Sequence, residues 1–319
     1  MASVISAIRF IGGIVLRNTI GPLKGTGGTN SARYCYSVWF RHLHWLNQNG
    51  ITNIPEKVIE FGPGDSLGIG LCALLSGTKE YHALDAVKCV DIVKNKALFE
   101  EIIKLFEIKA SIPDDREFPH IHPKLGSYDF PANILTEDII KSNLSESRIH
   151  QIRKELQNID NVDNTFIRYI APWNTTADIL PNSIDMIYSQ SVMEYVDELD
   201  KVYPLMYLWL KPRGIISHEI DFKSCGAAIT WNGHWGYSDW MLKLVKGRAE
   251  FSINRFPHSY HIREIKKCGF EILCDVYIKL ESGLKKDQIN KSLIHLFEDN
   301  DIYISSAFIQ AIRPDQKIS

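Results

Sequence analysis

The sequence predicts an α/β fold with a doubly wound, mostly parallel sheet of seven strands. Short apolar runs alternate with helix-like segments along most of the 319 residues. The first run leads directly into the glycine-rich turn GPGDSLG, and another helix-like segment follows. Strands that alternate with helices form a mostly parallel sheet that carries helices on both faces.

Seven segments are predicted to be strands, because each is a short apolar run next to turn-forming residues. They are KVIEF (57–61), EYHALDAV (80–87), TFIRYI (165–170), SIDMIYS (183–189), GIISHEID (214–221), FEILCDVYIKL (270–280) and DIYISSAFIQAI (301–312). A short helical segment joins the last two strands, so one of them can run antiparallel to its neighbours.

Helices are predicted between these strands from apolar periodicity and from stop signals. They cover residues 33–50, 66–77, 91–108, two polar segments through about 157, 191–210, 258–269 and a segment before the last strand. Gly50 and Gly77 mark the ends of the first two helices, and Ile102 and Phe106 share one face of the third.

The chain divides into two domains with two additions. A helical N-terminal arm covers 1–54, and the sheet domain covers 55–315, with an insertion at about 88–160 and a cap at about 222–257. The apolar start of the arm carries Arg9 and Arg17, so it is too short and too charged to span a bilayer. The favoured interpretation is an amphipathic helix packed on its own domain. Peripheral membrane contact and organelle targeting stay open.

Charge and cysteine content argue against several classes of protein. The net charge is -2 and no long basic run occurs, so a nucleic-acid partner is not expected. The six cysteines are scattered without a C-x-x-C pair, which predicts neither a disulfide framework nor a zinc site. Reduced thiols in the cytoplasm are the simplest interpretation.

VIEFGPGDSLGIG, residues 58–70, is the main candidate for a ligand-binding turn. Gly62 and Gly64 lie between strand and helix, where a missing side chain lets the backbone approach a ligand. The helix that follows offers free N–H groups. The glycine spacing differs from the dinucleotide pattern G-x-G-x-x-G, and Pro63 removes an N–H that a pyrophosphate would use.

Two acids define the ligand further. Glu60 stands at the end of the first strand, where it suits a cationic group such as an amino-acid ammonium. Asp85 ends the second strand, where a carboxylate can accept hydrogen bonds from both hydroxyls of a ribose. S-adenosylmethionine has a ribose, an amino acid and little negative charge, so it is the predicted cofactor.

At these residues the sequence resembles the class I S-adenosylmethionine-dependent methyltransferases. The resemblance covers about residues 55–315 and rests on four segments in order: VIEFGPGDSLGIG, YHALD, NSIDMIYSQSVMEYV and LKPRGIISHEID. It implies a Rossmann-like sheet. The predicted cofactor-binding residues are Glu60, Gly62, Gly64, Asp65, Gly68, Asp85, Asn174 or Asp178 at the adenine, and Gln190.

The methyl acceptor is expected at the ends of the fourth and fifth strands. His218 is the first candidate for general base, since its ordinary pKa is near neutral; His234 and His258 are alternatives, and Asp221 can orient the acting histidine. Relatives that bind a metal carry E-x-x-E-H at the fourth strand, whereas this chain has SVMEY, so no metal is predicted.

Aromatic and polar residues alternate in the predicted cap, around Trp231, Trp235, Tyr237 and Trp240. Such side chains suit sugar rings, and they suit the core of a small cap equally well. The cap and the SHEID run most resemble family members encoded with bacterial surface-polysaccharide genes. The prediction is therefore O-methylation of a small or saccharide-type acceptor.

Two other functions stay open. One is a catalytically silent fold that binds the cofactor or a partner protein, and the other is a dinucleotide oxidoreductase. The glycine spacing and Glu60 disfavour the oxidoreductase. The sequence leaves the oligomeric state undetermined.

Overall fold

The computed structural model describes residues 28–173, 179–247 and 252–315. The predictions made for the N-terminal segment 1–27, for Asn174 and for Asp178 lie outside these ranges.

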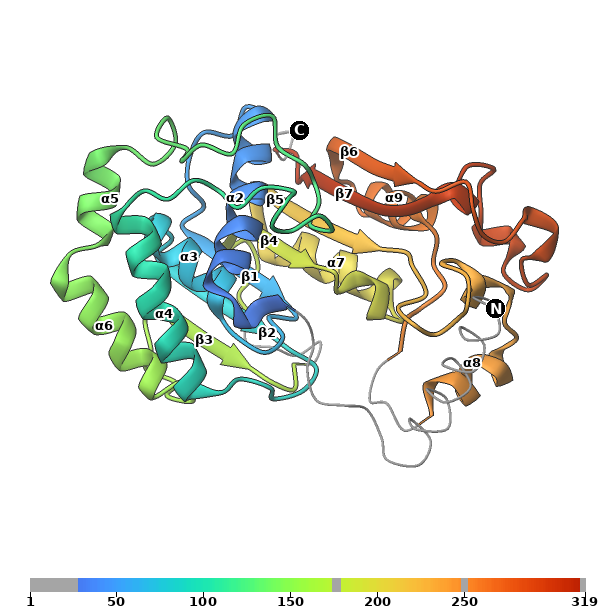
Figure 1. Ribbon diagram of the computed structural model, residues 1–319, viewed down its shortest axis with the longest axis horizontal. Coiled ribbons are helices and arrows are strands. Elements are labelled where there is room, and N and C mark those ends of the chain that lie inside the picture. The colour runs from blue at the N-terminus through green and yellow to red at the C-terminus, as the bar shows by residue number, and fades with distance from the viewer. Residues whose placement is uncertain (1–27, 174–178, 248–251, 316–319) are drawn as a thin grey trace.

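A seven-stranded sheet forms the centre of the molecule, in the order β3-β2-β1-β4-β5-β7-β6 (Figure 1). The strands are β1 (Lys57–Phe61), β2 (Glu80–Leu84), β3 (Ile167–Ile170), β4 (Ile184–Gln190), β5 (Leu210–Asp221), β6 (Glu271–Lys279) and β7 (Ile304–Ile312). The first five pair in parallel, whereas β7 runs antiparallel to both β5 and β6. The predicted mostly parallel α/β sheet is confirmed.

Helices cover both faces of this sheet. In chain order they are α2 (Ala32–Gln48), α3 (Gly68–Ser76), α4 (Ile92–Glu107), α5 (Glu137–Asn143), α6 (Glu146–Gln157), α7 (Leu199–Trp209), α8 (Asp239–Lys246) and α9 (His258–Lys267). Side chains cap several of their starts, as when Asp91 accepts hydrogen bonds from the backbone N–H groups of Val93 and Lys94. Gly77, with φ at +123°, ends α3 as the sequence predicts.

Alternation along the central strands divides the core into two layers. Val58 of β1 belongs to the cluster that includes α2, α3, α4 and α6. Ile59 and Phe61 belong to the opposite cluster, with α7 and α9. Because side chains alternate along a strand, neighbouring residues at the ends of these strands also face different layers. This alternation decides which polar residues can meet.

Two predicted helices differ from the structure: one forms only in its second half, and the other is absent from the described residues. The segment 191–210 forms a short 3-10 turn, η2 (Met193–Tyr195), and its helix α7 begins only at Leu199. Ser191 adopts φ +53°, a conformation that an α-helix does not contain.

The helix expected before the last strand is replaced by three 3-10 turns, η4 (Lys286–Gln288), η5 (Ile294–Leu296) and η6 (Asp301–Tyr303). Here the side chains of Asn290 and Asp301 accept backbone hydrogen bonds from Ser292 and Glu298. Such local bonds compete with a helix for the same N–H groups.

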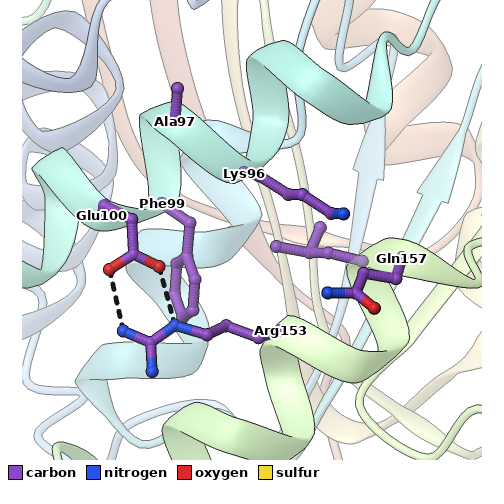
Figure 2. A pocket seen from close by; sticks show the side chains of 7 residues that line it. Lys96, Ala97, Phe99, Glu100, Arg153 and Gln157 are labelled. Atoms are coloured by element: carbon purple, nitrogen blue, oxygen red, sulfur yellow. Dashed lines mark hydrogen bonds and ion pairs between the residues drawn. The ribbon is translucent and has the colours of Figure 1, made fainter.

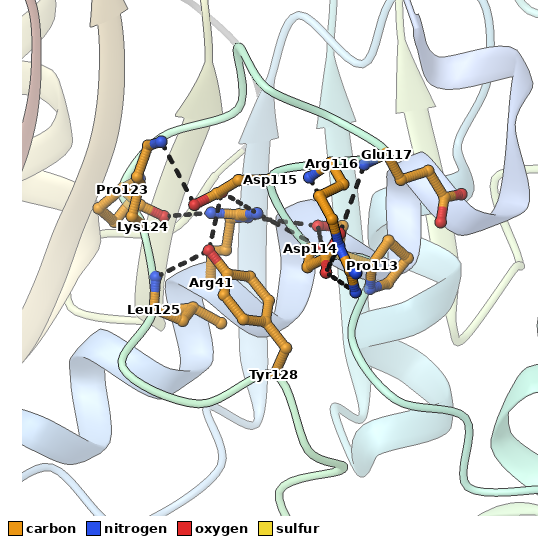
Figure 3. A network of polar contacts seen from close by, with 11 residues as sticks. Arg41, Pro113, Asp114, Asp115, Arg116, Glu117, Pro123, Lys124, Leu125 and Tyr128 are labelled. Carbon is orange, nitrogen blue, oxygen red and sulfur yellow. Dashed lines mark hydrogen bonds and ion pairs between the residues drawn. The ribbon is translucent and has the colours of Figure 1, made fainter.

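The long loop between α4 and α5 is fastened to α2 by a buried arginine (Figure 3). Arg41 is 1% exposed and donates hydrogen bonds to the carbonyl oxygens of Pro123 at 2.6 Å and Pro113 at 3.4 Å. It also lies 3.4 Å from Asp115, which accepts a hydrogen bond from Tyr128 at 2.7 Å. A buried guanidinium requires several acceptors, and the loop supplies them.

Candidate functional site

The turn between β1 and α3 has the backbone that the glycines predict. Gly62 and Gly64 adopt φ +62° and +71°, the left-handed region that favours glycine. A Cβ added to Gly62 would lie 2.7 Å from the side chain of Val192, which follows β4. The turn is therefore packed against the segment after β4, and a larger residue at Gly62 would push the two apart.

The first N–H groups of α3 are less available than the sequence suggests. The backbone N–H of Leu67 donates to Asn95 Oδ1 at 2.8 Å, and that of Gly68 donates to Ser66 Oγ at 3.2 Å. Ser66 in turn donates to the carbonyl oxygen of Thr29. The protein itself thus satisfies two of the donors that were expected to face a ligand.

Asp85, at the end of β2, has a buried carboxyl oxygen that can accept a further hydrogen bond. It is 9% exposed, and Oδ1 accepts a hydrogen bond from the N–H of Ala86 at 2.7 Å. Its Oδ2 is buried and has no partner among the residues that the structure describes. Burial raises the pKa of Asp85 to about 6, and backbone N–H groups of Ala86, Val87 and Gly64 oppose this rise. The contribution of Gly64 places the carboxyl beside the glycine turn.

Glu60 has a different environment from the one predicted. It is 2% exposed, and its Oε2 accepts hydrogen bonds from the hydroxyls of Tyr81 at 2.5 Å and Tyr188 at 3.2 Å. Burial raises its pKa to about 8. Glu60 lies inside the layer beneath α2 and α3, so both of its side-chain hydrogen bonds come from the protein; a role toward a ligand stays a prediction.

The remaining described cofactor candidates divide between turn and sheet. Asp65 accepts a hydrogen bond from Asn30 at 3.0 Å. Gly68 packs against α2, since an added Cβ would lie 2.4 Å from Cys35 Sγ. Gln190, at the end of β4, donates to Glu219 Oε2 at 3.2 Å. Gln190 therefore lies with the residues at the end of β5.

The carboxyl ends of β4 and β5 lie side by side in the sheet (Figure 1). Buried carboxyls gather at these two strand ends. Glu219 is 3% exposed and accepts a hydrogen bond from Ser191 Oγ at 2.7 Å. Glu194, in η2, is 2% exposed, and its Oε2 has no partner in the described ranges. Asp221 forms an ion pair with Lys223 at 2.8 Å. We call Glu194 and Glu219 the carboxyl pair.

Each member of the carboxyl pair influences the ionisation of its surroundings. The pKa of Glu219 is raised to about 7. Burial is the largest cause and Asp221 adds to it, whereas a hydrogen bond from Ser191 and the charge of Lys223 lower the pKa. Burial, followed by the charge of Glu219, raises the pKa of Glu194 well above its ordinary value. Burial and then the charge of Glu219 raise the pKa of Tyr34, and Cys35 and Glu194 add to this rise.

His218 does not lie with these carboxyls. Its side chain is fully buried on the opposite face of β5, where Nδ1 is 2.8 Å from Ser189 Oγ and the ring contacts Tyr203. Burial lowers its pKa to about 3. A base must reach the acceptor, and this position favours a structural role. The catalytic role of His218 stays a prediction that the geometry does not support.

His234 is also buried, at 1% exposed, in η3 (Gly233–Gly236). Burial and then the charge of Arg255 lower its pKa to about 3. Of the aromatic residues of the predicted cap, Trp235 packs edge-on against Phe297, and Trp240 is 67% exposed. These side chains are dispersed between core and surface. His258, the other alternative base, is 8% exposed and pairs with Asp275 at 2.8 Å.

Three residues beside these groups carry no signal in the sequence that predicts a role for them. Val192 closes over Gly62, burial and the charges of the carboxyl pair raise the pKa of Tyr34, and Asn95 occupies an N–H of α3. Strand alternation alone could have separated His218 from Glu219, because consecutive residues of β5 face opposite layers. Contacts from α2 and α4 have no signal in the sequence.

Solved methyltransferase structures resemble this chain weakly. One is an S-adenosylmethionine-dependent methyltransferase from Mesorhizobium loti, with 14% identity over 82% of this chain and 92% of that chain, at a TM-score of 0.40. Another, from Methanosarcina mazei, has 14% identity over 83% and 95%, at a TM-score of 0.42. A Haemonchus contortus phosphoethanolamine N-methyltransferase 2 has 14% identity over 94% of this chain and 59% of that chain, at 0.44.

No protein-family model matches the sequence, and no curated protein matches it significantly. At these identities and TM-scores the solved structures give no information on substrate. The strand order of the sheet is the independent basis for the fold.

A separate recess of about 260 Å³ lies between α4 and α6 (Figure 2). Its lining includes Lys96, Phe99 and Gln157, and the ion pair of Arg153 with Glu100, at 2.7 Å, stands beside it. These residues are remote in sequence from the glycine turn and share no contact with the carboxyl pair.

The described residues meet neither the requirement of a metal site built from His, Cys, Asp or Glu nor that of a membrane-spanning helix. Among residues 28–173, 179–247 and 252–315, no three His, Cys, Asp or Glu side chains are grouped to hold a metal ion. In the same ranges, none of the helices has the length and apolarity needed to cross a bilayer.

Proposed function

We propose that this chain is an S-adenosylmethionine-dependent methyltransferase that acts on a small-molecule acceptor. The observation that carries the proposal is the buried Oδ2 of Asp85 beside the glycine turn, which has no hydrogen-bond partner within the described part of the chain. A carboxylate at the end of β2 suits ribose hydroxyls, which can donate to that oxygen. Gly62 and Gly64 give the adjacent turn its left-handed backbone conformation. The cofactor would supply an electrophilic methyl group on a sulfonium.

The acceptor would bind at the carboxyl ends of β4 and β5. Val192, which follows β4, contacts the glycine turn. Glu194 belongs to the same segment, and Glu219 lies on the neighbouring strand β5. The finer proposal, transfer to a hydroxyl of a saccharide-type acceptor, comes from the sequence. It needs a proton acceptor near the hydroxyl, and Glu219 is better located for that role than His218.

Calorimetric titration of the full chain with S-adenosylmethionine, its demethylated product S-adenosylhomocysteine, and NAD tests the cofactor. We expect the first two to bind and NAD to show no heat. Asp85→Asn should weaken both by about ten- to a hundredfold, since a hydrogen bond to a charged group contributes about 1.5–3 kcal/mol. Asp160→Asn, an exposed carboxyl paired with Lys88, is the matched control and should change nothing.

The other outcomes identify the alternatives. Binding of NAD in place of the other two would establish the dinucleotide alternative. Absence of binding by all three would favour a catalytically silent fold, and unchanged affinity in Asp85→Asn would show that the ribose lies elsewhere.

A further inference from the structure

The carboxyl pair lies at the proposed acceptor side, where its two buried acids have no ion-pair partner among the described residues. Glu194 and Glu219 are 2% and 3% exposed, and neither forms an ion pair within the described part of the chain. The charge of Glu219 raises the pKa of Glu194, so these two buried carboxyls resist ionising together unless a cation is present. Lys223 is engaged by Asp221 at 2.8 Å. Among the described residues, Lys223 lowers the pKa of Glu219, but it is already paired with Asp221. A bound cation would therefore favour ionisation of the carboxyl pair.

An independent observation at this position is the free oxygen of Glu194. Among the described residues its buried Oε2 has no hydrogen-bond partner, although backbone N–H groups of Glu194 and Asp221 favour ionisation of the carboxyl. Both side-chain hydrogen bonds that Glu219 accepts, from Ser191 and Gln190, reach its Oε2. A buried acceptor without a donor is costly, so a donor is expected when the site is filled.

We propose that the methyl acceptor carries an amino group, bound as an ammonium ion between the carboxyls of Glu194 and Glu219. An ammonium brings three donors and one positive charge, which together satisfy a free carboxyl oxygen and the shared charge. A neutral hydroxyl would satisfy the oxygen alone. With the saccharide-type acceptor proposed above, the substrate class is an amino sugar. This inference rests on the proposed methyltransferase function.

Binding of the ammonium should release protons near neutral pH. Burial raises the pKa of Glu219 to about 7 and that of Glu194 well above its ordinary value, so the empty pair holds protons at pH 6 to 7. A bound cation favours the ionised form and displaces them. The other titratable groups around the pair are Tyr34, Tyr195, Asp221, Lys223 and Cys225. Of these, Lys223 opposes cation binding and Asp221 supports it.

The test uses the full chain saturated with S-adenosylhomocysteine. Glucosamine, N-acetylglucosamine and glucose are titrated at pH 7 in two buffers of different ionisation enthalpy, so that proton release is measured with affinity. We expect glucosamine to bind at least about tenfold more tightly than the two neutral sugars, with release of protons. Glu194→Gln and Glu219→Gln should each reduce that preference about tenfold and leave affinity for S-adenosylhomocysteine unchanged.

Glu198→Gln, an exposed carboxyl at the start of α7, is the matched control and should keep the preference. Glutamine is isosteric and relieves like-charge repulsion, so circular dichroism should show both test variants folded. Equal affinity for glucosamine and glucose would overturn the inference, as would a preference that survives in both variants. If the variants lose the cofactor product instead, the pair serves the methionine end of the cofactor. If wild type does not bind that product, the proposed function itself fails.

Discussion

Asp85 and the carboxyl pair present two buried acidic sites at the same edge of one sheet, and they are built differently. Asp85 is surrounded by backbone N–H groups of Gly64, Ala86 and Val87, which lower its pKa against burial. Glu219 has Asp221 near it, and Glu194 has both of these acids near it; these like charges raise their pKa values further.

The difference concerns the kind of ligand that each position can accept. A carboxylate already stabilised by backbone dipoles can receive neutral hydroxyl donors without needing a cation. A group of like charges gains most from a ligand that brings positive charge. The same residue type thus serves two proposed ligands, a ribose at one end and an amine at the other.

Gly62→Ala should have the largest effect on stability, because Gly62 packs against Val192, where the glycine turn beside Asp85 meets the segment that carries Glu194. Alanine at φ +62° is strained, and its Cβ would lie 2.7 Å from Val192. We expect a loss of about 3 kcal/mol in the free energy of unfolding, measured by urea denaturation.

Gly50→Ala is the matched control for this substitution. Gly50 adopts φ +81° with nothing within 4 Å of an added Cβ, so it reports backbone strain alone, about 1 kcal/mol. Equal losses in the two variants would show that the contact with Val192 contributes nothing.

The pH dependence of the free energy of unfolding tests whether Glu60 is held protonated inside the folded protein. Its folded pKa, about 8, exceeds its ordinary value of 4.5, so the folded state binds more protons between these limits and stability falls as pH rises through them. From pH 6.5 to 8 the loss from Glu60 should be about 2 kcal/mol. Buried histidines such as His218 and His261, with pKa about 3, act in the opposite direction below pH 6.5.

Urea denaturation at several pH values, in buffers of equal ionic strength, measures this slope. Glu60→Gln should flatten the curve between pH 6.5 and 8, whereas exposed Glu198→Gln should leave it unchanged. Glu219, whose pKa is about 7, and Glu194, whose pKa is also raised, leave part of the slope in this variant. A slope unchanged from wild type would show that Glu60 does not contribute to it.

Ser191→Ala should have the smallest effect and acts on the carboxyl pair alone. Its hydroxyl donates to Glu219 at 2.7 Å and lowers the pKa of that carboxyl. Its loss should cost about 1 kcal/mol of stability and move the proton release on glucosamine binding to higher pH. An unchanged pH midpoint would show that the proton belongs to another group.

The sequence was sufficient for the sheet and for the position of the glycine turn. Short apolar runs beside turn-forming residues and the stop at Gly77 depend on neighbouring residues, so they could be recognised without contacts. The helix assigned to 191–210 failed because its first part is held by the contact of Val192 with Gly62. The acids near the strand ends can be seen in the sequence. The proposed base, His218, was chosen from its ordinary pKa, and its burial on the opposite face of β5 could not be foreseen.

What the sequence by itself determined is the order of strands and helices, the glycine turn and the acid at the end of β2. These features follow from local periodicity and backbone sterics. Tertiary structure alone decided that Glu60 lies beneath two tyrosine hydroxyls, that His218 is sealed from the edge and that Glu194 meets Glu219. Burial and ionisation depend on residues distant in sequence, and only the packed sheet brings these together.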